Sequence, residues 1–181
     1  MFTIGHSNRS LEQFLELLTA NRVSLLVDVR TIPRSRHNPQ FNGDTLPHTL
    51  GAQGIGYEHL PGLGGLRHPR KDSVNTGWRN ASFRGYADYM QTEEFARHLA
   101  ALTGLKPRQN LAIMCAEAVP WRCHRSLIAD ALTIRGLPVT HILSASKAEP
   151  HQLTSFARVE GTRIIYPGPE LELFGPDAVT R

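Results

Sequence analysis

A short apolar run near residue 24 constrains the fold of this chain more than any other sequence feature. Residues 24–29 are almost continuously apolar, and the run ends in Asp28-Val29-Arg30. A strand of this kind is buried on both faces, which is typical of a parallel sheet covered by helices. Because polar groups follow at its carboxyl end, the run also predicts a functional edge, since ligands collect beyond the strand ends of open α/β sheets.

The other segments of the chain alternate between strand and helix patterns. Ser10 and Gln13 have the spacing of a capping box, and Leu11, Phe14 and Leu18 then recur on one helical face. The alternation predicts a single α/β domain with a mostly parallel β-sheet covered by helices on both faces, in a Rossmann-like three-layer arrangement. The expected strands are residues 2–4, 24–29, 55–60, 111–114, 139–143 and 162–166. One helix is expected to begin near residue 11, and further helices are expected at residues 45–52, 83–90, 93–102 and 123–134.

Two stretches fall outside this alternation. Residues 61–80 are rich in Gly, Arg, Pro and Asn and have no hydrophobic period. This composition predicts a long basic loop, and loops of such length are often functional. Residues 167–181 are expected to form a Pro-rich C-terminal extension of the domain, which comprises residues 1–181.

Composition places the chain among ordinary globular proteins. Its 181 residues are 40% hydrophobic and 20% charged, and no apolar run reaches membrane-spanning length, so no membrane partner is expected. The first residues lack a signal-peptide pattern, and the chain has only two cysteines, Cys115 and Cys123. These features predict a cytoplasmic protein without a structural disulfide. The net charge of +4 favours anionic partners without identifying nucleic acid, and the oligomeric state is left open.

The sharpest chemical signal lies in residues 115–125. The segment combines a thiol at a strand end with a second thiol, an imidazole and a guanidinium at a helix start. A helix N-terminus attracts anions and lowers the pKa of a nearby thiol, which makes the first thiol the expected nucleophile. The predicted catalytic residues are Cys115, His124 and Glu117, with Arg122 and Arg125 as anion-binding residues and Cys123 in support.

Two other interpretations of this segment stay open. In the first, the thiols are small buried hydrophobic groups, while His124 and Arg125 bond nearby carbonyls or carboxylates. In the second, Cys115, Glu117, Cys123 and His124 bind a metal ion, although their spacing is not a common zinc pattern. Apart from this metal alternative, the sequence predicts no cofactor.

A second polar segment follows the apolar run. Arg30, Arg34 and Ser35 are suited to neutralise and hydrogen bond a phosphate or sulfate, and Asp28 is suited to hold an arginine or accept a proton. His6 ends the first expected strand, and it reaches the same edge as a supporting proton carrier if the strands run parallel. The alternative is a buried Asp28–Arg30 pair beside a solvated basic loop.

Six short motifs resemble the bacterial and archaeal family called domain of unknown function 488. They occur in order over most of the chain, roughly residues 2–143, and they include both polar segments described above. The resemblance implies kinship with this family, whose label carries no settled reaction. The motifs are Thr3-Ile-Gly-His-Ser7, Leu26-Val-Asp-Val-Arg30, Pro33-Arg-Ser-Arg36, Leu63-Gly-Gly65, Met114-Cys-Ala-Glu117 and Cys123-His-Arg125.

A weaker likeness connects the chain to rhodanese-type sulfurtransferases and the related cysteine phosphatases. Those enzymes also place an Asp-Val-Arg at one strand end and, further along the chain, a cysteine loop before a helix. The spacing here differs, with six residues between Cys115 and Arg122, and Glu117 and Pro120 stand where a glycine-rich anion cradle is expected. A carboxylate in such a loop repels phosphate unless it points away or is protonated.

These observations predict a cysteine-dependent enzyme that acts on a small anionic substrate, containing sulfur or phosphate, in a basic pocket at the carboxyl ends of the strands. One alternative is a non-catalytic module that binds a nucleotide or nucleic acid through the same arginines, with incidental cysteines. The other alternative is the metal site described above.

Overall fold

The computed structural model describes residues 1–105 and 110–169, so most of the expected C-terminal extension, residues 170–181, lies outside the described residues. Six strands form the central sheet in the order β3-β2-β4-β1-β5-β6. Every neighbouring pair is parallel except β5 and β6, so the predicted mostly parallel sheet is confirmed. The strands are β1 (Phe2–Gly5), β2 (Leu25–Asp28), β3 (Gly56–His59), β4 (Leu111–Cys115), β5 (Thr140–Ile142) and β6 (Ala148–Pro150).

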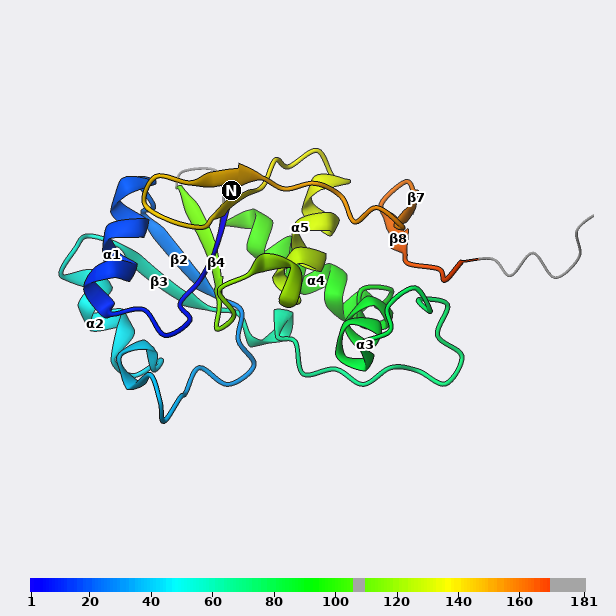
Figure 1. Cartoon of the computed structure of the whole chain (residues 1–181), viewed down its shortest axis with the longest axis horizontal. Helices are drawn as coiled ribbons and strands as arrows, with labels where there is room; N and C mark the ends of the chain where they lie inside the picture. The colour runs from blue at the N-terminus through cyan, green and yellow to red at the C-terminus, as the bar shows by residue number, and fades with distance from the viewer. Residues whose placement is uncertain (106–109, 170–181) are drawn as a thin grey trace, which may run out of the picture.

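Helices cover both faces of this sheet (Figure 1). α1 and α2 lie on one face, and α4 and α5 lie on the other, with α3 beside them. The predicted α/β class with helices on both faces is therefore confirmed. Across residues 1–105 and 110–169, no helix has both the length and the apolar character needed to cross a membrane. The helices are α1 (Leu11–Ala20), α2 (Leu46–Gly51), α3 (Ala81–Tyr89), α4 (Glu93–Gly104) and α5 (Arg125–Thr133), with short 3₁₀ turns η1 (Pro39–Phe41), η2 (Pro61–Leu63) and η4 (Pro120–Arg122).

The continuous apolar run of β2 is explained by its two covered faces. Leu26 packs in the apolar cluster formed with α1 and α2, whereas Leu25 and Val27 pack in the cluster formed with α3, α4 and α5. All three side chains are almost fully buried. Burying a side chain of this size contributes about 1.5–3 kcal/mol, so both faces of the strand stabilise the fold.

The predicted capping box begins α1. The Ser10 hydroxyl accepts a hydrogen bond from the backbone N–H of Gln13 at 3.2 Å, and the Gln13 side chain accepts one from the backbone N–H of Ser10 at 3.1 Å. These two bonds satisfy amide groups that the first helical turn leaves without partners. α1 therefore starts at the position that the sequence pattern indicates.

Three short strands differ from the sequence expectation. β6 pairs antiparallel with β5 at the sheet edge, and β7 (Arg158–Glu160) pairs with β8 (Arg163–Ile165) in a separate two-stranded sheet. The strand predicted at residues 162–166 therefore exists but lies outside the central sheet. All residues of β6 and β7 are exposed, so these strands carry no buried hydrophobic alternation from which a strand is predicted.

The long basic loop at residues 61–80 is attached to the domain by the buried carboxylate of Asp88. Asp88 accepts hydrogen bonds from the backbone N–H of Arg70 at 2.8 Å, the hydroxyl of Ser73 at 2.6 Å and the side-chain amide of Asn75 at 2.8 Å. Asn75 in turn accepts a hydrogen bond from the backbone N–H of Tyr166 at 2.9 Å. Polar contacts rather than a hydrophobic period therefore order this loop.

A chain of hydrogen bonds links α5 to β1 through two buried histidines. Asp130 accepts a hydrogen bond from Nε2 of His151 at 2.8 Å, which places the proton of His151 on that nitrogen. Nδ1 of His151 then accepts from Nε2 of His141 at 2.9 Å, and Nδ1 of His141 accepts from the hydroxyl of Thr3 at 2.7 Å. The chain requires neutral His141, and burial lowers the pKa of His141 to about 4.

We predict that acid destabilises the fold partly through His141. In the unfolded chain this residue titrates near its ordinary pKa of about 6.5, whereas in the folded chain its pKa is about 4. Between these two pH values the unfolded state therefore binds more protons than the folded state. Stability should therefore fall as the pH drops through this window. Measured by urea unfolding, the free energy of unfolding of the wild type should fall more between about pH 7 and pH 4.5 than that of the His141→Gln variant. Equal losses in the two proteins would contradict this assignment.

Candidate functional site

The carboxyl ends of β1, β2 and β4 meet at one edge of the sheet and border a cavity of about 620 Å³. This volume lies within the range of small-molecule sites. Two segments that are far apart in sequence, residues 30–35 and residues 115–124, both contribute to its wall. Nine of the eleven predicted site residues line this cavity, namely His6, Arg30, Arg34, Ser35, Cys115, Glu117, Arg122, Cys123 and His124, and the other two are Asp28 and Arg125.

A sulfur cluster occupies one wall of the cavity. Nδ1 of His124 lies 3.9 Å from Sγ of Cys115 and 3.7 Å from Sγ of Cys123, and these three atoms all lie within 4.8 Å of one another. Both thiols are free, and both are buried. The carboxylate of Glu117, the fourth member of the metal-binding set considered from the sequence, is not part of this cluster.

The two thiols of the cluster have different acidities. A hydrogen bond from Cys115 lowers the pKa of Cys123 to about 7 despite its burial, and the charge and backbone N–H of Arg125 act in the same direction. The same hydrogen bond, together with burial, raises the pKa of the Cys115 thiol. The surroundings therefore favour Cys123 as the thiolate of the pair, whereas the sequence pattern points to Cys115.

Arg125 organises the loop between the two cysteines. Its side chain is 1% exposed, and it donates hydrogen bonds to the backbone carbonyls of Glu117 and, at 2.8 Å, Ala118. The guanidinium thus holds the loop that returns from β4 to α5, where Cys123 comes back to Cys115. Arg125 contributes positive charge to the cluster from behind this loop, without lining the cavity.

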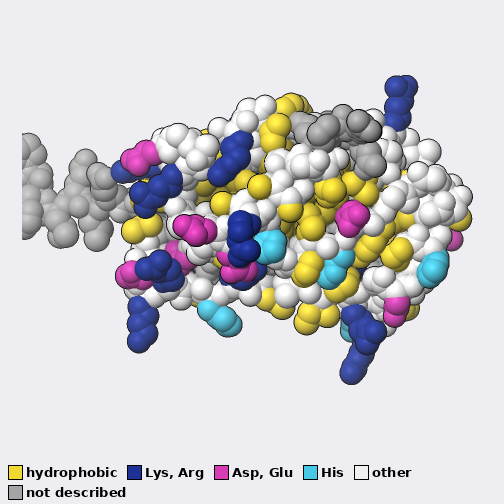
Figure 2. Space-filling model, turned by 180° about the vertical axis from the view of Figure 1, so that it is seen from behind, with side chains coloured by type: hydrophobic (Ala, Val, Ile, Leu, Met, Phe, Trp, Pro, Cys, Tyr) yellow, Lys and Arg dark blue, Asp and Glu magenta, His cyan; other side chains and the backbone are white. Residues whose placement is uncertain are grey.

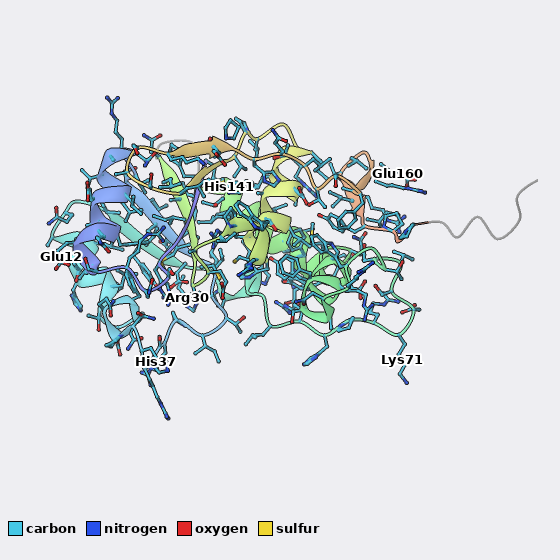
Figure 3. All side chains as sticks on the ribbon, viewed as in Figure 1. Glu12, Arg30, His37, Lys71, His141 and Glu160 are labelled. Atoms are coloured by element: carbon cyan, nitrogen blue, oxygen red, sulfur yellow. The ribbon has the colours of Figure 1, made fainter. Side chains whose placement is uncertain are left out.

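Arg30 occupies the end of β2 with most of its hydrogen-bond donors engaged. Its Nε and Nη2 donate to the fully buried carboxylate of Asp28 at 2.9 and 2.5 Å, and Nη2 also donates to the Phe41 carbonyl at 2.7 Å. The Tyr57 hydroxyl donates to Asp28 at 2.9 Å. The predicted Asp28–Arg30 pair is therefore present, and Figure 3 shows Arg30 where β2 ends.

His6 completes this network. Nδ1 of His6 lies 2.8 Å from the carbonyl of Ser7, which makes it the protonated nitrogen, and Nε2 faces Nη1 of Arg30 at 3.2 Å as an acceptor. The His6 ring stacks on Phe41 with ring centroids 4.5 Å apart. Burial lowers the pKa of His6 to about 4, and the positive charge of Arg30 adds to this effect. His6 is therefore a neutral, oriented imidazole at the edge of the cavity.

The remaining predicted residues form a polar, exposed rim. Arg34 and Arg122 are exposed, as is Glu117, and Arg34 makes only a 3.6 Å ion pair with Asp44. The hydroxyl of Ser35 accepts a hydrogen bond from the backbone N–H of Asn38 at 3.1 Å. The basic side chains of the loop at residues 61–80 are not among those that line the cavity, and Lys71 lies far from Arg30 along this loop (Figure 3).

Two glycines that sequence reasoning did not single out as site residues allow these segments to approach one another. A Cβ atom on Gly5 would lie 1.7 Å from the backbone oxygen of Glu117, and one on Gly65 would lie 2.4 Å from Nδ1 of His124. Gly65 also lines the cavity. Both positions fall inside the short motifs quoted above, where a glycine signals close backbone approach.

The sequence profile of one protein family matches this chain over residues 10–132. The family is described as Domain of unknown function DUF488. The chain belongs to the DUF488 family. The predicted family membership is confirmed, and the matched region includes β2, β4 and the whole sulfur cluster.

Neither curated proteins nor solved structures returned a match to this DUF488 chain. The likeness to rhodanese-type sulfurtransferases and cysteine phosphatases therefore gains no support from these comparisons. His6 and the whole of β1, which ends at Gly5 beside the cysteine loop, precede the matched region.

We predict that the contact between β1 and the cysteine loop tolerates no side chain at Gly5. Gly5→Ala should lower the free energy of unfolding by about 1–3 kcal/mol, because the added methyl group meets backbone rather than a movable side chain. Gly104→Ala is the matched control, since a Cβ there meets nothing within 4 Å, and it should be neutral or stabilising by up to about 1 kcal/mol. Urea unfolding measures both, and equal effects would show that the loop adjusts freely.

Proposed function

We propose that this DUF488 chain is an enzyme that acts on a small anionic substrate in the cavity and uses the thiols of Cys115 and Cys123 as its reactive centre. The observation that most supports this proposal is the meeting of two thiols and the His124 imidazole on the wall of a cavity that arginines also line. Guanidinium groups suit phosphate- and sulfate-like oxyanions, which makes these the substrate class.

The rim of the cavity supports a more specific substrate. Besides Arg34 and Arg122, it carries Ile32 and Leu66, whose side chains are 64% and 72% exposed, and Phe83. Large apolar side chains exposed beside a polar site offer a surface for an apolar part of the ligand. The proposed substrate therefore joins an anionic group, held near the arginines, to an apolar or aromatic body.

Thiolate is the reactive form of cysteine, both as a nucleophile and as a metal ligand. As a nucleophile, the sulfur forms a bond to an electrophilic sulfur or phosphorus atom while the bond from that atom to its leaving group breaks. The leaving group departs with the electron pair and takes a proton from His124 or Glu117. Water or a second acceptor then takes the transferred group, which frees the thiolate and returns a proton to the same base.

A module that only binds nucleic acid is supported less well. Such modules present clustered basic side chains along one face. On the face seen in Figure 2, Lys and Arg side chains are interspersed with Asp and Glu. The arginines of the cavity wall include the buried Arg30, which faces a space of small-molecule size rather than an extended strand.

The cysteines provide the first test of this proposal. Cys115→Ser and Cys123→Ser should each reduce turnover of phosphate monoesters or thiosulfate by more than about a hundredfold while phosphate binding persists. Turnover assays on a panel of these compounds, combined with calorimetric phosphate titrations, make the comparison. Turnover that survives in either serine variant would overturn the proposal. A wild type that converts none of them but binds nucleotides, with affinity that falls steeply with salt, would favour the binding module.

The rim arginine provides a second test with a matched control. Arg34→Ala should weaken phosphate binding about fivefold, equivalent to about 1 kcal/mol for an exposed charge. Arg36→Ala removes an equally charged, exposed side chain two positions further on, which does not line the cavity, and it should leave binding unchanged. Isothermal titration with phosphate at constant ionic strength measures both. Equal weakening in the two variants would show a general charge effect instead of a site.

A further inference from the structure

We infer that Cys115, Cys123 and His124 form a binding site for one zinc ion, coordinated by the two sulfur atoms and by Nδ1 of the imidazole. The measured separations between nitrogen and sulfur are 3.9 and 3.7 Å. In a tetrahedral zinc site with bonds of about 2.3 Å to sulfur and 2.0 Å to nitrogen, these atoms lie about 3.5 Å apart. These two distances therefore need to shorten by a few tenths of an ångström, and the two sulfur atoms, which lie within 4.8 Å of each other, need to come to about 3.8 Å.

The chemistry of the ligand set suits zinc. Two thiolates and one imidazole occur together in catalytic zinc sites, where three protein ligands leave a further position open. The two thiolate charges cancel the double positive charge of the ion, so the occupied site is neutral and its burial carries a small electrostatic cost. Nε2 of His124 is buried without a hydrogen-bond partner, so Nδ1 is the ring nitrogen with polar neighbours.

The protein positions these three ligands independently of a metal. Cys115 is fixed at the end of β4, where its carbonyl accepts a hydrogen bond from the backbone N–H of His6 at 3.0 Å. The backbone N–H of Cys123 donates to the carbonyl of Pro120 at 3.0 Å, which closes the turn η4. His124 stands at the N-cap of α5 with Gly65 directly beside its ring. Ligands that are held in this way make a site preorganised.

The open coordination position would face the cavity, because all three ligand residues line it. This part of the inference rests on the anionic substrate of the proposed function and replaces its thiolate attack, because both sulfur atoms would bind the metal: the open position would take a water molecule or an anionic atom of the substrate. Arg122 and the exposed carboxylate of Glu117 also line the cavity. The neutral metal centre would thus adjoin one cationic and one anionic side chain, the latter able to accept a proton.

Metal analysis of the purified full chain tests the inference. Protein that is produced with zinc in the medium and kept reduced should contain about one zinc ion per chain, as measured by inductively coupled plasma mass spectrometry. Cys115→Ser, Cys123→Ser and His124→Ala should each lose most of it. His48→Ala is the control, because His48 is exposed on α2 on the other face of the sheet and should leave the metal content unchanged.

Cobalt substitution keeps the test decisive if a variant fails to fold. Metal-free wild type titrated with Co²⁺ should develop thiolate-to-cobalt charge-transfer absorption that saturates at about one equivalent. A wild type that contains no zinc and shows no such band would overturn the inference. Turnover could also persist in chelator-treated, metal-free enzyme and be lost in the serine variants. That result would overturn zinc as the reactive centre and would leave the proposed thiol enzyme intact. Stoichiometric zinc with unaffected turnover in the serine variants would overturn the proposed function and leave the metal site.

Discussion

A fully buried carboxylate at the end of β2 holds the guanidinium around which one half of the site is arranged. Asp28 accepts from Arg30 through both of its oxygens and from the Tyr57 hydroxyl, and Arg30 also contacts the Phe41 carbonyl and His6. Burying either charge alone costs several kcal/mol, so each group is tolerated only because the other is present. The pair therefore joins β1, β2, β3 and the η1 turn at one point beside the cavity.

Arg125 plays the corresponding part for the other half of the site. A buried guanidinium needs acceptors, and it finds them in the carbonyls of the loop that follows β4. Satisfying these donors shapes the loop so that Cys123 returns to Cys115, and it leaves a positive charge next to the sulfur atoms. The same hydrogen bonds therefore determine both the path of the backbone and the electrostatics of the thiols.

The sequence predicts the framework of the site because the framework follows from periodicity and topology. The apolar run ending in Asp28 requires a strand covered on both faces, and parallel strands bring their carboxyl ends to one edge. Arg30 and Cys115 are therefore expected to be neighbours although they are far apart in the chain. The family motifs carry the same information, since they mark the ends of β1, β2 and β4.

The different positions and properties of residues of the same type do not follow from the sequence. Arg122 and Arg125 have the same side chain and lie three positions apart, yet one is exposed at the cavity and the other is 1% exposed behind the loop. Likewise, the hydrogen bond between the two thiols, together with the charge and the backbone N–H of Arg125, makes Cys123 the more acidic of the pair. Such assignments depend on how the loop between the two cysteines folds and on which side chains it buries, which neither spacing nor composition encodes. The exposed strands β6 and β7 are not predicted from the sequence for a related reason, because hydrogen bonding to a neighbouring strand, rather than a hydrophobic pattern, defines them.

Burial also separates the site into a rigid centre and an adjustable rim. Arg30, Cys115 and Cys123 are each less than 10% exposed and are held by hydrogen bonds to backbone or to buried partners. Arg34 and Glu117 are exposed and retain most of their rotamer freedom, which they lose only when they contact a ligand. In the proposed enzyme, the reacting groups would thus lie where geometry is fixed, and the groups that recognise the anion would lie where side chains adapt. Under the proposed function, the rim would accommodate related substrates, whereas a substitution in the centre would change the reaction itself.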